Sequence, residues 1–292
     1  MISILIPAKD YACYPLVEAL HKQGEASGMP FEILLGEDGS TTEGLRLNSA
    51  ADNLSCCRRI ISKENIGRAR IRNMLAREAQ YPYLIFIDCD AVVENEGFIS
   101  CYARALKKNQ VVCGGLYHAP TLPCNDCTLR YRYEKKADKK RDAATRGKAP
   151  YDRFTTFNFA IERELFLGIR FNERITKYGH EDTLFGKELE KAGIEILHID
   201  NMLLHNGLES NEIFLKKTEQ SLESLAMIEK EIGYTPLLDT VKRLSRYRMT
   251  GLFMAYWKHN RKRLRKNLLG NNPSLFRFNL YKLGYYISKT QG

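Results

Sequence analysis

The sequence has 292 residues, of which 44% are hydrophobic and 27% are charged, and its formal net charge is +10. These proportions exclude a wholly disordered chain, and no apolar run approaches the roughly 20 residues of a membrane-spanning helix. The start, MISILIP, lacks the basic region of a secretory signal and is followed at once by Lys9 and Asp10. We therefore expect a cytoplasmic protein.

The eight cysteines fit that compartment. Six have no regular spacing and are expected to act as small buried apolar residues: Cys13, Cys56, Cys57, Cys89, Cys101 and Cys113. Cys124 and Cys127 form one isolated C-x-x-C. A zinc site needs four ligands, and only His118 lies near enough in sequence to help. The pattern thus favours ordinary cysteines over metal or redox chemistry.

Strands and helices alternate in the first third of the sequence. Apolar, β-rich runs at residues 2–6 (ISILI) and 83–91 (YLIFIDCDA) are typical of buried parallel strands, and residues 31–40 (FEILLGEDGS) predict a strand that runs into a turn. Residues 14–27 and 64–79 have the apolar spacing of helices. This order predicts right-handed β-α-β units and a parallel sheet.

The middle of the sequence changes character. Residues 110–117 (QVVCGGLY) predict another strand, but residues 129–150 are charged and nearly free of aliphatic side chains. We expect this stretch to be an exposed helix or a mobile loop inserted between sheet elements. Regular patterns then return, with a strand and helix at 154–167, a helix that ends at Gly193, a strand pair at 194–205 and a helix at 209–232.

Acidic pairs follow two of the predicted strands and begin one helix. They are Glu37-Asp38, Asp88 with Asp90, and Glu181-Asp182. In parallel sheets, ligands bind beyond the carboxyl ends of the strands. Two carboxylates one residue apart repel each other unless a cation neutralises them, so Asp88 and Asp90 predict a site for Mg²⁺ or Mn²⁺. The other two pairs, taken alone, also fit turns and helix caps.

Several motifs in a fixed order resemble the family 2 glycosyltransferases of GT-A fold. They are ISILIPAKD, GEDGS, NIGRARIRN, IDCDA, FNFAIERELF, GHEDTLFGKELEKAG and LLH. The resemblance covers residues 1–207 and implies a Rossmann-like α/β domain with a mostly parallel central sheet, followed by a helical, basic extension at 208–292. It also implies an inverting enzyme that uses Mn²⁺ or Mg²⁺ to move a sugar from a nucleotide-diphosphate sugar, most commonly a UDP-sugar, to an acceptor hydroxyl.

The resemblance gives roles to single residues. It implies that Asp182, beside Glu181, is the general base. Metal ligands are implied at Asp90, Asp88 and His205, although a histidine at a strand end also fits a satisfied surface residue. Donor contacts are implied for Pro7, Asp38, Asn65, Gly67, Arg72, Asp88 and Asn158. Two departures from the family pattern are Ala8-Lys9-Asp10 after Pro7 and Glu37 in place of an aspartate.

The C-terminal region carries the basic charge. Residues 240–292 contain thirteen Lys or Arg and no Asp or Glu, and residues 247–265 and 274–287 mix aromatic and aliphatic side chains with cations. This composition suits an anionic membrane surface on the inner face of the cytoplasmic membrane. A lipid-linked or other saccharide acceptor for surface polysaccharide or glycolipid would then lie near the active site. A helical face packed on the catalytic domain fits the same pattern.

Three other functions fit less well. Nucleic-acid binding by the tail is not expected, because the sequence has no recognition motif and its acidic turns repel phosphate. A sugar nucleotidyltransferase is expected to begin with a glycine-rich phosphate loop, which ILIPAKDYACYP lacks. A non-catalytic donor-binding relative is disfavoured because Asp90 and Asp182 are both present.

Overall fold

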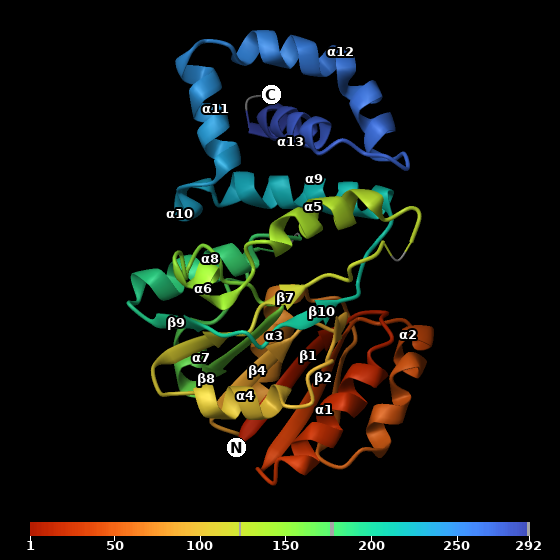
Figure 1. Ribbon diagram of the computed structural model, residues 1–292, viewed down its shortest axis with the longest axis vertical. Coiled ribbons are helices and arrows are strands. Elements are labelled where there is room, and N and C mark those ends of the chain that lie inside the picture. Colours follow the sequence, from red (N-terminus) through yellow and green to blue (C-terminus); the bar gives the residue numbers. More distant parts are fainter. Residues whose placement is uncertain (123, 176–177, 291–292) are drawn as a thin grey trace. The chain divides into compact units, whose positions relative to one another are not determined.

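The computed structural model describes residues 1–122, 124–175 and 178–290, and its contacts divide the chain into two compact units (Figure 1). Unit 1 consists of Met1–His118, Asp138–Thr176 and Glu181–Gly207. Unit 2 consists of Ala119–Ala137, Lys177–His180 and Leu208–Gly292. Unit 2 thus combines the C-terminal region with a segment from the middle of the sequence.

Unit 1 is built on a seven-stranded sheet with strand order β3-β2-β1-β4-β8-β6-β9. The strands are β1 (Ile2–Ala8), β2 (Phe31–Asp38), β3 (Cys57–Ser62), β4 (Tyr83–Ile87), β6 (Gln110–Cys113), β8 (Asn158–Glu162) and β9 (Glu195–His198). All neighbours are parallel except that β8 runs antiparallel to both β4 and β6. The sheet is mostly parallel, as predicted from the resemblance.

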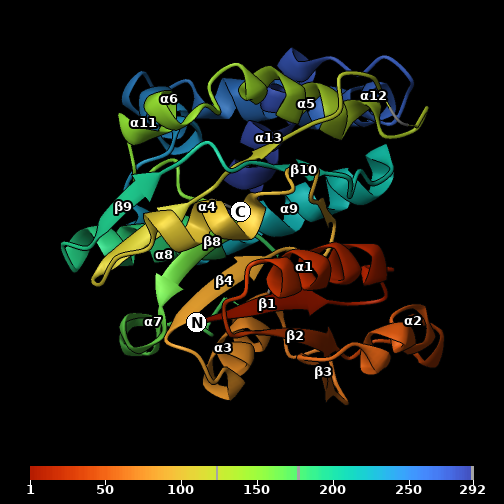
Figure 2. The same cartoon turned by 60° about the horizontal axis from the view of Figure 1, so that its bottom comes forward.

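Helices cover both faces of this sheet, which explains why its central strands are apolar throughout. They are α1 (Tyr14–Ala26), α2 (Thr42–Leu47), the 3₁₀ turn η1 (Ser49–Asn53), α3 (Arg68–Glu78), α4 (Phe98–Ala105), α6 (Ala143–Gly147), α7 (Arg163–Ile169) and α8 (Glu181–Lys191). Along β1, Ile4 and Ile6 pack in the core beside α1, and Leu5 packs in the core beside α3. Helices α1 and α3 therefore lie on opposite faces of the sheet (Figure 2).

A second, three-stranded sheet in unit 1 has the order β5-β10-β7. Its strands are β5 (Ala91–Val92), β10 (Leu203–His205) and β7 (Leu116–Tyr117). The register places His205 opposite Ala91 in the antiparallel pair, and Leu204 opposite Tyr117 in the parallel pair. This small sheet therefore brings together chain segments that are far apart in sequence.

Unit 2 is helical, with α5 (Thr128–Asp138), α9 (Asn211–Met227), α10 (Glu229–Ile232), α11 (Pro236–Arg246), α12 (Thr250–Leu268) and α13 (Leu275–Thr290). The last residue of α5, Asp138, is counted with unit 1. Trp257 of α12 packs directly on Gly284 of α13, where an added Cβ would lie 2.1 Å from the indole ring. Across the described residues, no helix is both long and apolar enough to cross a membrane.

One expectation for the middle of the sequence was wrong in part. Residues 129–150 form helices α5 and α6, which agrees with the expected helix, but they are not wholly exposed, because Leu129, Arg130 and Arg146 are buried. Burial of these arginines is possible because their guanidinium groups find acceptors: Arg130 pairs with Glu134 and Glu209, and Arg146 donates to the carbonyls of Cys113, Gly114 and Ile199.

The cysteines also differ from expectation. Cys124 and Cys127 form a disulfide in unit 2 instead of remaining ordinary reduced residues. Of the other six, Cys13 and Cys113 are buried, as expected, whereas Cys56 is exposed.

Candidate active site

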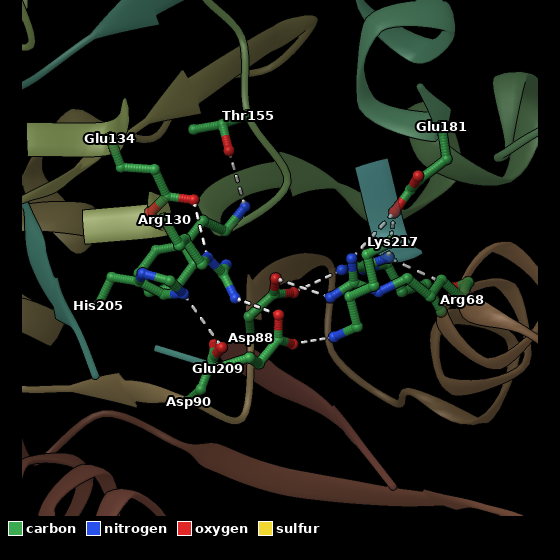
Figure 3. Close-up of polar contacts among 12 residues, drawn as sticks. Arg68, Asp88, Asp90, Arg130, Glu134, Thr155, Glu181, His205, Glu209 and Lys217 are labelled. Carbon is green, nitrogen blue, oxygen red and sulfur yellow. Dashed lines mark hydrogen bonds and ion pairs between the residues drawn. The ribbon is translucent and has the colours of Figure 1, made fainter. Parts of the chain in front are cut away.

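The side chains of Asp90 and His205 meet at the edge of the small sheet. Asp90 lies in the turn between β4 and β5, and His205 ends β10. Because His205 is opposite Ala91 in the ladder, its ring reaches the neighbouring Asp90, and the two groups are 3.1 Å apart from Nε2 to Oδ2 (Figure 3). The imidazole is buried and packs edge-on against Phe157, which restricts its orientation.

The surroundings of Asp90 are close-packed. Gly207 lies so near that an added Cβ would be 1.9 Å from Oδ2 of Asp90. Burial, followed by the charge of Asp90, raises the pKa of the Tyr11 phenol to about 12. The position of the Asp90 carboxylate depends on the absence of a side chain at residue 207.

Asp88 is paired with arginines from α3. Its Oδ1 accepts a hydrogen bond from Nη2 of Arg72 at 2.5 Å, and its Oδ2 lies 3.5 Å from Nη2 of Arg68. The same two arginines approach Oε1 of Glu181, at 3.5 Å from Arg68 and 3.8 Å from Arg72 (Figure 3). One strand end, one helix and the start of another helix thus meet in a network of alternating charges, with Arg72 buried and Arg68 half-exposed.

Asp182 follows Glu181 in the first turn of α8. Its Oδ1 accepts hydrogen bonds from the backbone N–H of Thr183 at 2.7 Å and from the Thr183 hydroxyl. Burial, reinforced by the charge of Glu181, raises the pKa of the Asp182 carboxyl from 3.8 to about 6. A carboxylate with this pKa is ionised at neutral pH yet more basic than usual, which suits proton abstraction.

Asp38 ties two loops together at the ends of β2 and β3. Its carboxylate accepts hydrogen bonds from the backbone N–H groups of Ile66, at 2.7 Å, and Gly67, at 3.1 Å. The next residue, Gly39, has a φ of +61°, and an added Cβ would lie 2.3 Å from the backbone nitrogen of Asn65. The turn after β2 therefore requires glycine and fixes the loop that leads into α3, whereas the Asn65 side chain is exposed.

The two departures from the family pattern support this turn. Lys9 donates from Nζ to the carbonyl of Gly39 at 2.8 Å, and Asp10 accepts from the backbone and hydroxyl of Thr41. Glu37 is fully buried and accepts hydrogen bonds from Asn48 and from a serine hydroxyl in the turn. These residues replace the usual ones without leaving the turn unsupported.

Two of the predicted donor-binding residues, Asn158 and Arg72, are buried and bonded to other parts of the protein. Asn158 is fully buried, and its amide donates to the carbonyls of Gly115 and Asn201 while its oxygen accepts from the Tyr102 hydroxyl. Arg72 is 1% exposed and is directed at Asp88 and Glu181. Both hold other parts of the site in place. Pro7 lies half-buried in β1.

The structure thus groups the predicted residues into three sets. Asp90 contacts His205, and Arg72 pairs with both Asp88 and Glu181. Asp38 organises the loop with Asn65 and Gly67. Sequence reasoning missed Arg68 and Gly207. Arg68 lies four residues before Arg72 and therefore on the same face of α3, a spacing that signals its role, whereas nothing local marks Gly207.

Comparison with known proteins gives a family match, a relative and similar solved structures. The family model described as glycosyl transferase family 2 matches residues 3–167. A cholesterol galactosyltransferase of Borreliella burgdorferi is 26% identical over 217 residues, which are 69% of this chain and 60% of that protein. The chain therefore spans less than two thirds of this relative.

Among solved structures, a mannosyltransferase from Pyrobaculum calidifontis, in complex with GDP-Man and Mn²⁺, aligns with a TM-score of 0.57 and 14% identity, covering 99% of this chain and 86% of that one. TarS of S. aureus aligns with a TM-score of 0.51 and 17% identity, covering 78% of this chain and 39% of that one. At such identities the likeness concerns the fold, and it matches the GT-A architecture expected from the motifs.

Proposed function

We propose, from the premise that the chain belongs to glycosyl transferase family 2 and is a glycosyltransferase, that its reaction inverts the anomeric carbon and requires a divalent metal ion. The observation that carries this proposal is the meeting of Asp90 and His205 at one edge of unit 1. In the same unit, Arg68 and Arg72 pair with both Asp88 and Glu181, and Glu181 directly precedes Asp182.

The donor set at Asp90 fits a divalent ion. A carboxylate oxygen and an imidazole nitrogen are 3.1 Å apart, close to the edge, about 3.0 Å, of an octahedron with bonds of about 2.1 Å. An imidazole ligand favours Mn²⁺ over Mg²⁺, which prefers oxygen. When bound, such an ion would neutralise charge that develops on the departing diphosphate. Asp88, which is directed at arginines, would then act as their counter-charge, and its predicted role as a ligand remains a prediction.

Asp182 is proposed as the general base. It takes the proton of the acceptor hydroxyl while that oxygen forms a bond to the anomeric carbon and the bond from that carbon to the diphosphate oxygen breaks. Attack from the face opposite the leaving group inverts the configuration in a single displacement. Arg68 and Arg72 pair with the neighbouring Glu181 and so limit the like-charge repulsion that would otherwise raise the pKa of Asp182 further.

For the donor, a UDP-sugar is the proposal. Asp38 lies at the end of β2, where the family resemblance places the nucleotide, although its carboxylate is engaged with the loop before α3. Other family members use other nucleotides, and the solved mannosyltransferase holds GDP-Man. Because a ligand that binds only the folded state raises its stability, thermal shifts with UDP, GDP and dTDP in the presence of Mn²⁺ would rank the bases.

For the acceptor, we propose a saccharide or lipid-linked saccharide presented at the inner face of the cytoplasmic membrane, in surface polysaccharide or glycolipid synthesis. Two observations support a lipid acceptor. One is that the Borreliella relative is named for cholesterol. The other is that residues 240–290 of unit 2 expose apolar and basic side chains together, and the last two residues of the predicted membrane-binding region lie outside the described part.

The central test replaces Asp182 with Asn, which keeps the shape but cannot accept the proton. Turnover should fall roughly 10²–10⁴-fold while donor binding is largely kept. Asp152→Asn, a surface aspartate of unit 1 paired with Lys187, is the matched control. Transfer would be followed as nucleotide release and donor binding by calorimetry. If Asp182→Asn kept more than about a tenth of wild-type turnover, Asp182 would not be the base.

A further inference from the structure

A second buried histidine, His118, contacts the ring of His205. Nε2 of His118 lies 3.3 Å from Nδ1 of His205, and the two rings meet edge-on. His118 directly follows β7, and the parallel register of β7 with β10 places it beside His205. Its ring is buried, so this contact occurs inside unit 1 and away from solvent.

His118 is held in turn by Asp138. Nδ1 of His118 lies 2.8 Å from Oδ1 of Asp138, and the backbone N–H of His118 donates to Oδ2 of the same carboxylate. Arg141 pairs with Asp138 at 3.2 Å. Since an ionised carboxylate paired with an arginine only accepts hydrogen bonds, the proton of a neutral His118 ring is on Nδ1.

The hydrogen on Nδ1 of His118 determines which ring nitrogen of His205 carries a hydrogen. With Nδ1 protonated, Nε2 of His118 is an acceptor, so Nδ1 of His205 carries its own hydrogen and donates to it. Nε2 of His205 is then unprotonated, and its lone pair faces Oδ2 of Asp90. Two acceptors at this distance are brought together favourably by a cation that both of them bind.

We propose that His118 and Asp138 are positioning residues that set the tautomer and orientation of His205 as a ligand for the divalent ion. This inference rests on the metal site of the proposed function. In metal sites generally, a second residue that holds the other ring nitrogen of a histidine ligand makes the ligand more basic and fixes its ring. Here that partner is His118, whose other ring nitrogen contacts the carboxylate of Asp138. Figure 3 shows the contact between Asp90 and His205.

The test measures binding of Mn²⁺, alone and with UDP, from the EPR signal of the free ion, using the full chain. His118→Phe removes the acceptor for His205, and Asp138→Asn can offer an N–H to His118 and so reverse both tautomers. Each should weaken Mn²⁺ binding roughly 10–100-fold. His118→Gln can present an amide oxygen at the position of Nε2, so its affinity should lie between that of His118→Phe and wild type.

Two kinds of control make the result decisive. His21→Phe changes another buried histidine of unit 1, which contacts Ser55 on α1's side of the sheet, and should leave Mn²⁺ binding unchanged. Thermal unfolding in EDTA shows whether each variant is folded; if His118→Phe is not, Asp138→Asn and His118→Gln carry the test.

The outcomes separate the two proposals. If His205→Ala loses Mn²⁺ binding while His118→Phe and Asp138→Asn keep the wild-type affinity within about twofold, the positioning chain is wrong and the metal site stands. If wild type binds no Mn²⁺, or if Asp90→Ala and His205→Ala bind it normally, the metal site itself is wrong, and the positioning role falls with it.

Discussion

The carboxylate of Asp90 keeps its place because the chain has a glycine at residue 207. A methyl group at this position would lie 1.9 Å from Oδ2 and 2.7 Å from Cβ of Asp90. The backbone of Gly207 has no positive φ, so alanine is compatible with its conformation, and the collision with Asp90 is the main consequence. A single methyl group can therefore displace a predicted metal ligand without removing one.

We expect Gly207→Ala to weaken Mn²⁺ binding at least tenfold while the protein stays folded, because ligand positions must be held to within about 0.5 Å. Mn²⁺ titration by EPR and thermal unfolding in EDTA would measure the two effects. Gly168→Ala is the matched control, since an added Cβ there meets nothing within 4 Å. Unchanged Mn²⁺ affinity in Gly207→Ala would mean that Asp90 does not bind the ion.

The pKa of Asp182 gives a second prediction for single residues. Because only the ionised carboxylate accepts a proton, turnover should fall by about tenfold per pH unit below pH 6, where burial places the pKa of Asp182. The measurement is turnover against pH at saturating substrate. A profile that is flat down to pH 5 would contradict the assignment.

The same shift predicts an effect on stability with its sign fixed. The folded-state pKa, about 6, exceeds the ordinary value of 3.8, so the folded state binds more protons between these values and the free energy of unfolding falls as pH rises through them. At pH 7 the buried charge is therefore unfavourable, and Asp182→Asn should unfold at a temperature no lower than wild type. A marked loss of stability would show that Asp182 has a structural role.

Single residues also show where the sequence stops being informative. Asp90 stands out because two carboxylates one residue apart at a strand end repel each other unless a cation neutralises them, and Asp182 stands out through the family motif in which it lies. His118 carries no such signal, because its contact with His205 depends on the pairing of β7 with β10 across 87 residues of sequence. Asn158 shows a different limit, since the motif match predicted a donor contact but could not show that the fold engages every group of the amide.

At the level of helices and strands, continuous apolar runs were reliable. The runs at 2–6 and 31–40 correspond to β1 (Ile2–Ala8) and β2 (Phe31–Asp38), whose side chains are buried on both faces. The strand β3 was missed, since its sequence CRRIIS, at the sheet edge, has neither a continuous apolar run nor a regular alternation of polar and apolar side chains, and it is short. The burial of arginines in α5 and α6 was not foreseen, because their hydrogen-bond acceptors come from residues distant in sequence, which composition does not reveal.

Helix α13 contains a lysine whose environment predicts a measurable effect. The Nζ of Lys282 lies 4.7 Å from the ring centre of Tyr133 and 4.6 Å from that of Phe278, and desolvation lowers the pKa of Lys282 to about 8 from 10.5. Between these pH values the unfolded chain binds more protons than the folded one, so the free energy of unfolding rises with pH. Below pH 8 the charged lysine is a constant cost, which the aromatic faces partly offset.

We expect Lys282→Met, which keeps the length of the side chain, to raise the free energy of unfolding at pH 7 by about 1–3 kcal/mol and to remove the rise between pH 8 and pH 10. Chemical denaturation at the three pH values measures both effects. Lys262→Met, at an exposed position of α12, is the control. Loss of stability in Lys282→Met at pH 7 would show that attraction to the two rings outweighs desolvation.

At the scale of the whole molecule, the predicted catalytic residues and the basic C-terminal residues belong to different units. The family model matches residues 3–167, and the predicted base and His205 follow it in unit 1, whereas the basic residues after 240 belong to unit 2. Much of the aromatic content of that region, including Trp257, Phe278 and Tyr281, forms the core of unit 2 itself. The apolar surface that remains exposed is therefore smaller than the sequence suggested.

Part of that exposed surface lies around the start of α12, at Tyr247, Met249, Leu252 and Tyr256, which we term the α12 patch. Tyr247 and Leu252 are 70% and 71% exposed, and Leu252 and Tyr256 are one helical turn apart on the same face. Arg246 and Arg248 flank Tyr247 and are exposed as well. Apolar side chains beside cations suit insertion among anionic lipid headgroups better than contact with a folded acidic protein, because insertion buries the apolar side chains in the acyl region while the cations remain at the headgroups.

We therefore expect the protein to float with vesicles that contain anionic lipid, to stay behind with neutral vesicles, and to be released by raised salt, since the attraction between the cations and the leaflet is screened. Replacing both Leu252 and Tyr256 with Ser should reduce binding at least tenfold, because burial of each side chain contributes roughly 1.5–3 kcal/mol. Leu122→Ser, at an exposed leucine elsewhere in unit 2, should float like wild type. Equal flotation of the double variant and wild type would show that the α12 patch is not the membrane contact. If the wild-type protein does not bind anionic vesicles, the membrane is not its partner, and the roles proposed for Asp90 and Asp182 are unaffected.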